Sequence, residues 1–343
     1  MVKVQVGNES KFWKNKNILV TGAGGFVGSN LCKHFFELGA NVVGMVRDLD
    51  EIKNLKLFNI DSKINIVIGN LVDKEFLYRV LQKYNINSVY HLAAQVVVSI
   101  ANEGPLSTFE SNIRGTYMLL EAIRIYGKVK RVVIASSDKS YGIHKKLPYK
   151  EDFPLQPHFP YDVSKASADM IAKSYFYAYK MPIVITRFAN IFGPGQLHFS
   201  AIIPDTMMSI LNNNDPVIRS DGTPERDFLY VKDVVRIYEI LGRNLQNKKL
   251  HGEVFNAGHG KPIKILDLVN TILKVIKSDL KPVIKGKHKP KLEIDRQYLD
   301  STKIKKVLGY KHKYSIAEGL LETYKWYKEN FKKLNKKYQG KHR

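Results

Sequence analysis

The chain has 343 residues, 44% of them hydrophobic, which excludes a disordered or fibrous protein and is enough for one large α/β unit with a smaller partner domain. The 55 Lys and Arg exceed the 32 Asp and Glu by 23 charges, but they are scattered along the chain, so we expect no nucleic-acid partner. No run of roughly 18 apolar residues exists and the N-terminus is polar, so we expect a cytoplasmic protein with no membrane partner. The single cysteine, Cys32, excludes an internal disulfide.

Short apolar segments rich in Val and Ile alternate with segments of helical period between residue 17 and about residue 190. This alternation is typical of repeated strand–helix units around a buried parallel sheet. Asp73 can cap a helix over the residues that follow it, and Ser107 or Thr108 can open a long helix that ends at Tyr126. The expected strands are Ile18–Thr21, Asn41–Val46, Ile64–Ile68, Ser88–Leu92, Arg131–Ala135 and Ile183–Thr186.

The rhythm changes after residue 190, where a GPGQ loop and the turn-rich SDGTPERD segment interrupt the alternation. We therefore expect a first domain over residues 1–190, a smaller α/β domain over 191–331 and a basic tail over 332–343. Strands from the second half could return to the first sheet. The later helices are expected at Ser164–Tyr179, Pro204–Asn212, Ile265–Ile276 and Ile316–Phe331.

A glycine-rich loop, TGAGGFVG, follows the first strand and opens a helix, with glycines at Gly22, Gly25 and Gly28. The first glycine permits a tight turn, the second lets the backbone approach a pyrophosphate, and the third lets helix and strand pack closely. The helix N-terminus then offers free N–H groups to the anion. The loop therefore predicts a bound dinucleotide.

The end of the second expected strand indicates which dinucleotide is bound. A carboxylate there binds the adenosine ribose, whereas an arginine accommodates a 2′-phosphate. Arg47 follows the position where the carboxylate is expected and favours NADP, but Asp48, one residue later, could reach the ribose and favour NAD. The sequence slightly favours NADP and leaves NAD open.

Tyr161 and Lys165 lie four residues apart at the start of an expected helix, so both side chains share one face. The lysine charge can lower the pKa of the tyrosine, which then takes a proton from a substrate hydroxyl as a hydride departs. Ser137, Asp138 and Lys139 follow an expected strand and add a hydroxyl, an acid and an amine. The alternative for Asp138 and Lys139 is a surface ion pair without a chemical role.

These motifs together resemble the extended short-chain dehydrogenases/reductases of the nucleotide-sugar epimerase/dehydratase family, over about residues 15 to 330. The resemblance implies a Rossmann-type doubly wound parallel sheet and cofactor contacts from further residues near the strand ends. The matching motifs are TGAGGFVG, HLAAQ, NIRGT, SSDKSYG, YDVSK, RFANIFGPG and RDFLYVKDVV. The cofactor contacts implied in addition to Gly22, Gly25, Arg47, Asp48, Tyr161 and Lys165 are Phe26, Val27, Asn70, Leu71, Leu92, Ala93 and Ala94.

Within this family the Ser137-Asp138-Lys139 triplet resembles CDP-glucose 4,6-dehydratases, whereas the glycine loop and the RDFLYVKD segment depart from that branch. The resemblance implies a tightly bound NAD(P) and conversion of an NDP-hexose to an NDP-4-keto-6-deoxyhexose. Tyr161, assisted by Lys165 and Ser137, would deprotonate the C4 hydroxyl, Lys139 would take the C5 proton, and Asp138 would protonate the departing C6 hydroxyl. A 4-epimerase of the same family and a non-catalytic dinucleotide-binding protein are the alternatives.

The resemblance also implies substrate contacts and an assembly. Asn190, Arg226 and Arg296 map onto residues that hold the diphosphate, and arginine suits this role because its planar fork donates two hydrogen bonds to phosphate. His198 lies in a segment that resembles a substrate lid. His91 is expected to be a satisfied core histidine, and the histidines show no metal-ligand spacing. Residues 107–126 and 161–180 resemble the helices through which the family forms homodimers.

Overall fold

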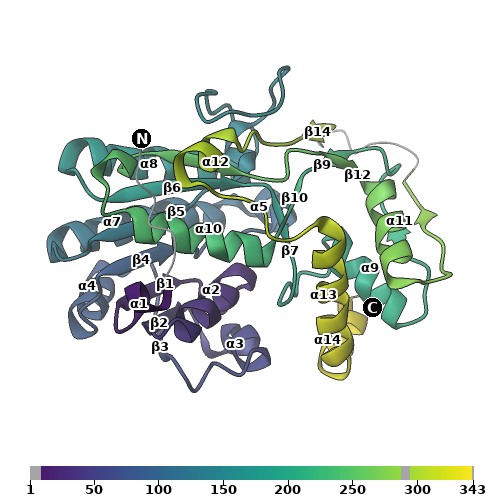
Figure 1. The fold of residues 1–343 in the computed structure, drawn as a ribbon, viewed down its shortest axis with the longest axis horizontal. Helices are drawn as coiled ribbons and strands as arrows, with labels where there is room; N and C mark the ends of the chain where they lie inside the picture. Colours follow the sequence, from purple (N-terminus) through teal and green to yellow (C-terminus); the bar gives the residue numbers. More distant parts are fainter. Residues whose placement is uncertain (1–8, 287–293, 342–343) are drawn as a thin grey trace.

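The computed structural model describes residues 9–286 and 294–341, so the ends of the polar N-terminus and of the basic tail lie outside the described residues. A seven-stranded sheet, parallel throughout, forms the centre, in the order β11-β6-β5-β4-β1-β2-β3 (Figure 1). The reversal of strand order beside β1 is the doubly wound arrangement expected from the sequence. The strands are β1 Asn17–Thr21, β2 Asn41–Val46, β3 Asn65–Ile68, β4 Ser88–His91, β5 Arg131–Ala135, β6 Ile183–Phe188 and β11 Val254–Ala257.

Helices cover both faces of this sheet, and each face has its own apolar core. One core joins Val20 of β1 to Phe35 of α2 and Leu241 of α10. The other joins Leu19 of β1 to helices α4, α7 and α8. Neighbouring residues of one strand therefore point into different cores, as expected for a sheet buried on both sides. The flanking helices are α1 Glu9–Trp13, α2 Phe26–Glu37, α3 Lys53–Leu57, α4 Lys74–Lys83, α7 Gly115–Tyr126, α8 Pro160–Tyr179, α10 Val231–Asn244 and α12 Thr302–Leu308.

The second half of the chain builds a smaller helical lobe beside the sheet, with short strand pairs at the junction (Figure 1). Its helices are α9 Ile202–Leu211, α11 Ile265–Ile276, α13 Ile316–Glu329 and α14 Phe331–Lys341. The short strands are β7 Asn190–Phe192 with β10 Phe228–Tyr230, β12 Ile263–Lys264 with β9 Glu225–Arg226 and β14 Arg296–Gln297, and β13 Val283–Ile284 with β8 Val217–Ile218.

All six strands expected from the sequence are present, with ends shifted by no more than two residues. The expected long helix ending at Tyr126 is interrupted. It is preceded by α5 Val98–Glu103 and α6 Pro105–Phe109, and Glu110–Arg114 forms a π-helical turn. The Asn112 side chain bonds outside its own helix, which accounts for this local departure from α-helical geometry.

The expected division near residue 190 is crossed by the chain. Strand β11 pairs with β6, and helix α10 packs on α2, so residues beyond 190 complete the first sheet and its core. Part of the expected basic tail forms α14, in which Leu334 and Tyr338 are buried. Among the described residues, none of the helices combines the length and apolar character required to span a bilayer.

Candidate active site

The glycine loop closes tightly between β1 and α2. Gly22 has a φ of +70°, which L side chains rarely adopt, and a Cβ at Gly28 would lie 2.0 Å from the carbonyl oxygen of Gly22. Gly25 is the N-cap of α2, and no acidic residue occupies the first turn. Phe26 and Val27 begin that helix. The backbone N–H groups of this turn are therefore open to an anion, and the loop fits a dinucleotide pyrophosphate.

A buried hydrogen-bond network ties the ends of β1 and β4 together. His91 Nδ1 lies 2.8 Å from Thr21 Oγ1, and His91 Nε2 lies 3.0 Å from Thr116 Oγ1. Thr21 Oγ1 also accepts the N–H of Ala93. Burial lowers the pKa of His91 to about 3, and the charge of Lys165 adds to this, so the imidazole is neutral. The prediction of a satisfied core histidine is confirmed.

Arg47 and Asp48 follow β2 and form an exposed charged cluster with Glu51. Arg47 Nε lies 3.3 Å from Asp48 Oδ2, and its NH2 lies 3.2 Å from Glu51 Oε1. The Asp48 carboxylate also accepts the N–H of Glu51 and caps the turn Leu49–Ile52. Arg47 and Asp48, the two residues that bear on the choice between NADP and NAD, therefore form an ion pair with each other.

The remaining predicted cofactor residues lie just beyond the carboxyl ends of β3 and β4. Asn70 accepts the N–H of Val72, and Leu71 packs against the position of Gly115. Leu92 packs against the core beneath α2, and Ala94 is partly buried. In open α/β sheets, ligands bind at this edge of the strands. The contacts of these residues with a cofactor remain a prediction.

Tyr161 and Lys165 project from the first turns of α8, which begins with Pro160. Burial raises the pKa of Tyr161, and a side-chain hydrogen bond with Ser137 opposes this. Burial lowers the pKa of Lys165 to about 8, and Asp169 opposes this. The Lys165 Nζ donates to the carbonyl of Ala135. Ser137 therefore lowers the pKa of Tyr161 in this structure. The effect of Lys165 on the tyrosine remains a prediction.

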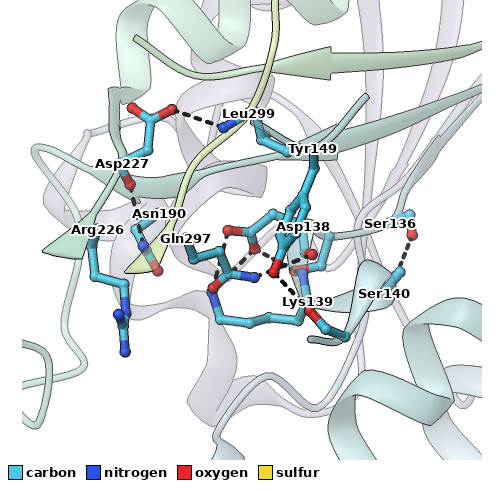
Figure 2. A network of polar contacts seen from close by, with 12 residues as sticks. Ser136, Asp138, Lys139, Ser140, Tyr149, Asn190, Arg226, Asp227, Gln297 and Leu299 are labelled. Carbon is cyan, nitrogen blue, oxygen red and sulfur yellow. Dashed lines mark hydrogen bonds and ion pairs between the residues drawn. The ribbon is translucent and has the colours of Figure 1, made fainter. Parts of the chain in front are cut away.

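Asp138 and Lys139 begin a short 3₁₀ turn, Asp138–Tyr141, directly after Ser137. Lys139 Nζ lies 3.1 Å from Asp138 Oδ1 and 2.7 Å from Gln297 Oε1 (Figure 2). Asp138 is only 3% exposed. Asp138 and Lys139 therefore form an ion pair. The alternative of a surface ion pair is wrong, because the Asp138 carboxylate is buried.

Gln297 is a site residue that the sequence did not indicate. It is fully buried on β14, and its Nε2 donates to the carbonyl oxygen of Asp138 at 3.3 Å. Since 159 residues separate Asp138 from Gln297, no local pattern connects them. The parallel pairing of β14 with β9, which sets Gln297 opposite Arg226, brings this amide to the turn Asp138–Tyr141.

Two further buried carboxylates lie near Asp138. Burial raises the pKa of Asp162 to about 6, with Lys139 lowering it and Asp138 raising it. Burial also raises the pKa of Asp227 to about 6, although backbone N–H groups of Gly260 and His259 donate to that carboxylate. The site thus contains two acids, Asp162 and Asp227, whose pKa is raised toward neutral pH.

The structure brings some of the predicted substrate residues together. Asn190 donates to the carbonyl oxygen of Asp227 at 3.2 Å, and Figure 2 shows Asn190, Arg226 and Asp227 on one side of the Asp138–Lys139–Gln297 cluster. Arg226 donates to the carbonyl oxygen of its neighbour Glu225.

Arg296 and His198 are placed differently. Arg296 Nε lies 2.8 Å from Glu225 Oε2, and the Arg296 side chain is 53% exposed. His198 is exposed. The roles of Asn190, Arg226, Arg296 and His198 toward a substrate remain predictions.

Residues 19–323 match the model of the family described as GDP-mannose 4,6 dehydratase. A trifunctional UDP-glucose 4,6-dehydratase/UDP-4-keto-6-deoxy-D-glucose 3,5-epimerase/UDP-4-keto-L-rhamnose-reductase, RHM3 of Arabidopsis thaliana, is 30% identical over 325 residues, which cover 93% of this chain. The chain spans about half the length of that relative, 48%.

Solved structures of similar proteins have the same fold. The epimerase Mth375 from Methanothermobacter thermautotrophicus has a TM-score of 0.86 and 29% identity, with 96% of both chains covered. DesIV, a dTDP-glucose 4,6-dehydratase from Streptomyces venezuelae with NAD and TYD bound, has a TM-score of 0.80 and 28% identity, with 92% of this chain and 97% of that chain covered. With the glycine loop and the Tyr161–Lys165 pair in place, these matches show that the chain belongs to the GDP-mannose 4,6-dehydratase family of nucleotide-sugar epimerases and dehydratases.

Proposed function

We propose that the chain is a nucleotide-sugar 4,6-dehydratase that converts an NDP-hexose to an NDP-4-keto-6-deoxyhexose. The observation that carries this proposal is the buried Asp138 carboxylate hydrogen-bonded to Lys139, next to the Tyr161–Ser137 pair. An epimerase needs only the oxidation and reduction of C4, whereas elimination of water needs an acid and a base as well. The similarity to named 4,6-dehydratases supports the same activity.

The glycine loop and the carboxyl ends of β1 to β5 form the site for a nicotinamide dinucleotide. Gly22, Gly25 and the first turn of α2 would hold its pyrophosphate. A dinucleotide held there would supply the hydride chemistry, the oxidation at C4 of the sugar and the reduction at C6. Lys165 lies four residues after Tyr161 in α8 and would hold the nicotinamide ribose.

Different side chains carry out the successive proton transfers. Tyr161 takes the proton of the C4 hydroxyl, and Ser137 stabilises the phenolate through its hydroxyl. The resulting C4 ketone acidifies the C5 proton, which Lys139 accepts in its neutral form. Asp138 in its protonated form then donates to the C6 hydroxyl, which leaves as water.

Mass spectrometry of the nucleotide sugar tests this proposal. Purified protein is incubated with UDP-, dTDP-, CDP- and GDP-hexoses, and the products are weighed. We expect one substrate to lose one molecule of water with wild-type protein and to keep its mass with Asp138→Asn. A product of unchanged mass but altered C4 configuration would establish the epimerase instead, and no reaction with any sugar would favour a non-catalytic dinucleotide-binding protein.

The choice between NADP and NAD rests on Arg47. Its guanidinium supports NADP, whereas the carboxylates of Asp48 and Glu51 that hold it would oppose a 2′-phosphate and support NAD. Extraction of the protein as purified, followed by mass analysis of the released dinucleotide, identifies the cofactor. If NADP is bound, Arg47→Ala should shift the preference toward NAD, and an unchanged ratio would exclude Arg47 as its determinant.

The exposed face of α8 supports a homodimer. Met170 is 62% exposed and Tyr177 is 67% exposed, and at a spacing of seven residues they lie on one face. An apolar face of this kind is typical of a helix-to-helix contact between subunits. Sedimentation should give twice the chain mass for the wild type and the chain mass for Met170→Lys, and a monomeric wild type would contradict the dimer. The cytoplasmic location remains a prediction that cell fractionation can test.

A further inference from the structure

The Gln297 side chain reaches from the C-terminal half of the chain into the catalytic turn. Its Oε1 accepts a hydrogen bond from Lys139 Nζ at 2.7 Å, and its Nε2 donates to the carbonyl oxygen of Asp138. The residue is fully buried, and β14 fixes its backbone through the contact between the Asp227 N–H and the Gln297 carbonyl oxygen at 3.2 Å. One end of the amide is therefore bound to the amine of Lys139, and the other end is bound to the backbone of Asp138.

We propose that Gln297 is a positioning residue that holds the Lys139 amine against the Asp138 carboxylate, so that the two side chains share one proton through the dehydration step. The inference rests on the proposed dehydratase function. It adds a residue, and a path for the proton, to the roles of Asp138 and Lys139 themselves.

The observed geometry allows the proton to be accounted for completely. The Lys139 ammonium passes a proton to Asp138 along the 3.1 Å hydrogen bond, which leaves a neutral amine and a carboxylic acid. The amine then takes the C5 proton, the electrons of the C5–H bond form the C5–C6 double bond, and the C6–O bond breaks. Asp138 gives its proton to the departing hydroxyl, which leaves as water. Lys139 is again an ammonium and Asp138 a carboxylate, so no proton from solvent is required.

A neutral amide suits the position between these groups. Asp138 and Asp162 already bring two carboxyl groups close to Lys139. A third carboxylate in contact with Lys139 would hold the proton on the amine and oppose its transfer to Asp138. The phenols of Tyr149 and Tyr161, which also face Asp138, have a raised pKa and stay neutral. The Gln297 oxygen orients the amine without adding a charge.

Two variants at Gln297 separate positioning from charge. Gln297→Met keeps the length and removes both hydrogen bonds, whereas Gln297→Glu keeps the shape and adds a charge. Gln246→Met, which replaces an exposed glutamine just after the end of α10, is the matched control. Single-turnover reactions use the sugar that the wild type dehydrates and are repeated across a range of pH. The amount of reduced cofactor is measured by absorbance, and the loss of water is measured by mass.

We expect C4 oxidation by both variants to stay within about twofold of the wild type. Dehydration by Gln297→Met should fall by roughly ten- to a hundredfold, the cost of a lost hydrogen bond to a charged group, and reduced cofactor should accumulate. The pH of fastest dehydration should move upward for Gln297→Glu, because the added negative charge favours the protonated forms of Lys139 and Asp138, and the pair loses its shared proton only at a higher pH. If Gln297→Met does not fold, the shift in the pH of fastest dehydration by Gln297→Glu decides whether the inference holds.

Three outcomes would overturn the inference. Dehydration at the wild-type rate in both variants would show that the reaction does not need the hydrogen bonds of Gln297. An equal loss of oxidation and dehydration, with an unmoved pH profile, would show a merely structural role. A wild type that releases no water from any NDP-hexose would overturn the proposed function, and this inference with it, before any variant is compared.

Discussion

At the scale of single residues, burial decides the protonation of the groups that move protons. Tyr161 is partly buried and Lys165 is buried, and desolvation drives each toward its neutral form. For Tyr161 this means a phenol at rest, which gives up its proton only when the site stabilises the phenolate. For Lys165 it means an amine that titrates within reach of physiological pH.

Removal of the Tyr161 hydroxyl should stop C4 oxidation while the fold is kept. We expect Tyr161→Phe to lower turnover by about 10²- to 10⁴-fold, because general acid–base catalysis contributes on that scale. The absence of reduced cofactor in a single turnover is the measurement. Tyr177→Phe, on the exposed face of the same helix, is the matched control and should react like the wild type. Full turnover by Tyr161→Phe would remove the tyrosine from the mechanism.

Replacement of Lys165 should change activity and stability in opposite directions. Its folded-state pKa of about 8 lies below the ordinary 10.5, so the buried charge costs stability at neutral pH, and this cost is relieved as pH rises from 8 toward 10.5. Lys165→Met should abolish turnover and raise the free energy of unfolding at pH 7 by about 1–3 kcal/mol. Urea unfolding should show this gain shrinking between about pH 8 and pH 10, and a gain independent of pH would contradict the assignment.

At the scale of elements, the turn between β1 and α2 depends on the absence of side chains. Gly28→Ala places a methyl group against the Gly22 carbonyl, so we expect a loss of roughly 1–3 kcal/mol of stability and a large loss of dinucleotide affinity. Thermal unfolding and cofactor titration measure the two effects. Gly104→Ala is the matched control, since its Cβ would meet nothing within 4 Å. Equal behaviour of the two alanine variants would refute the steric argument.

Helix α8 is fixed to the sheet by a buried ion pair. Arg187 of β6 donates to both carboxylate oxygens of Asp169, at 2.8 and 3.0 Å, and neither side chain is more than 1% exposed. Asp169→Asn leaves a buried guanidinium without its counter-charge, so we expect a loss of about 3–5 kcal/mol in chemical unfolding. The exposed pair Lys33–Glu37 is the control, and Glu37→Gln should cost no more than about 0.5 kcal/mol.

At the scale of the whole molecule, the two halves of the chain are interdependent. Strand β11 and helix α10 come from beyond residue 190 but belong to the first sheet and its core. The Trp13 indole donates to Glu239 of α10 at 2.6 Å, which links the N-terminus to the second half. Residues on both sides of residue 190 therefore build one sheet and one shared core.

Residues 1–190 alone should not form a stable domain. Without α10 and β11, the apolar face of α2 and the edge of β6 are exposed to water, so we expect this fragment to unfold without a cooperative transition, whereas the full chain unfolds cooperatively. Circular dichroism during urea titration makes the comparison. A fragment that unfolds cooperatively and binds the dinucleotide would show that residue 190 is a true domain boundary.

The sequence predicted features that depend on local pattern and missed those that depend on distant pairing. The strands around the glycine loop and the Asp73 cap follow from the residues at those positions, and the structure has them there. The π-helical turn at Asn112 depends on a bond to Ser164, and the role of Gln297 depends on β14 pairing with β9. Residue type alone could not reveal either, because the partners are more than fifty positions apart.

The pairing of β6 with β11 has a consequence for how the chain is made. Synthesis delivers β6, which ends at Phe188, long before β11, which begins at Val254, so β6 stays an open edge while the whole segment between them emerges. An unpaired edge strand with six buried positions is a template for other nascent chains. Because contacts this distant in sequence form slowly, the interval before β11 arrives is the period in which the growing protein is most exposed to aggregation and most dependent on chaperones.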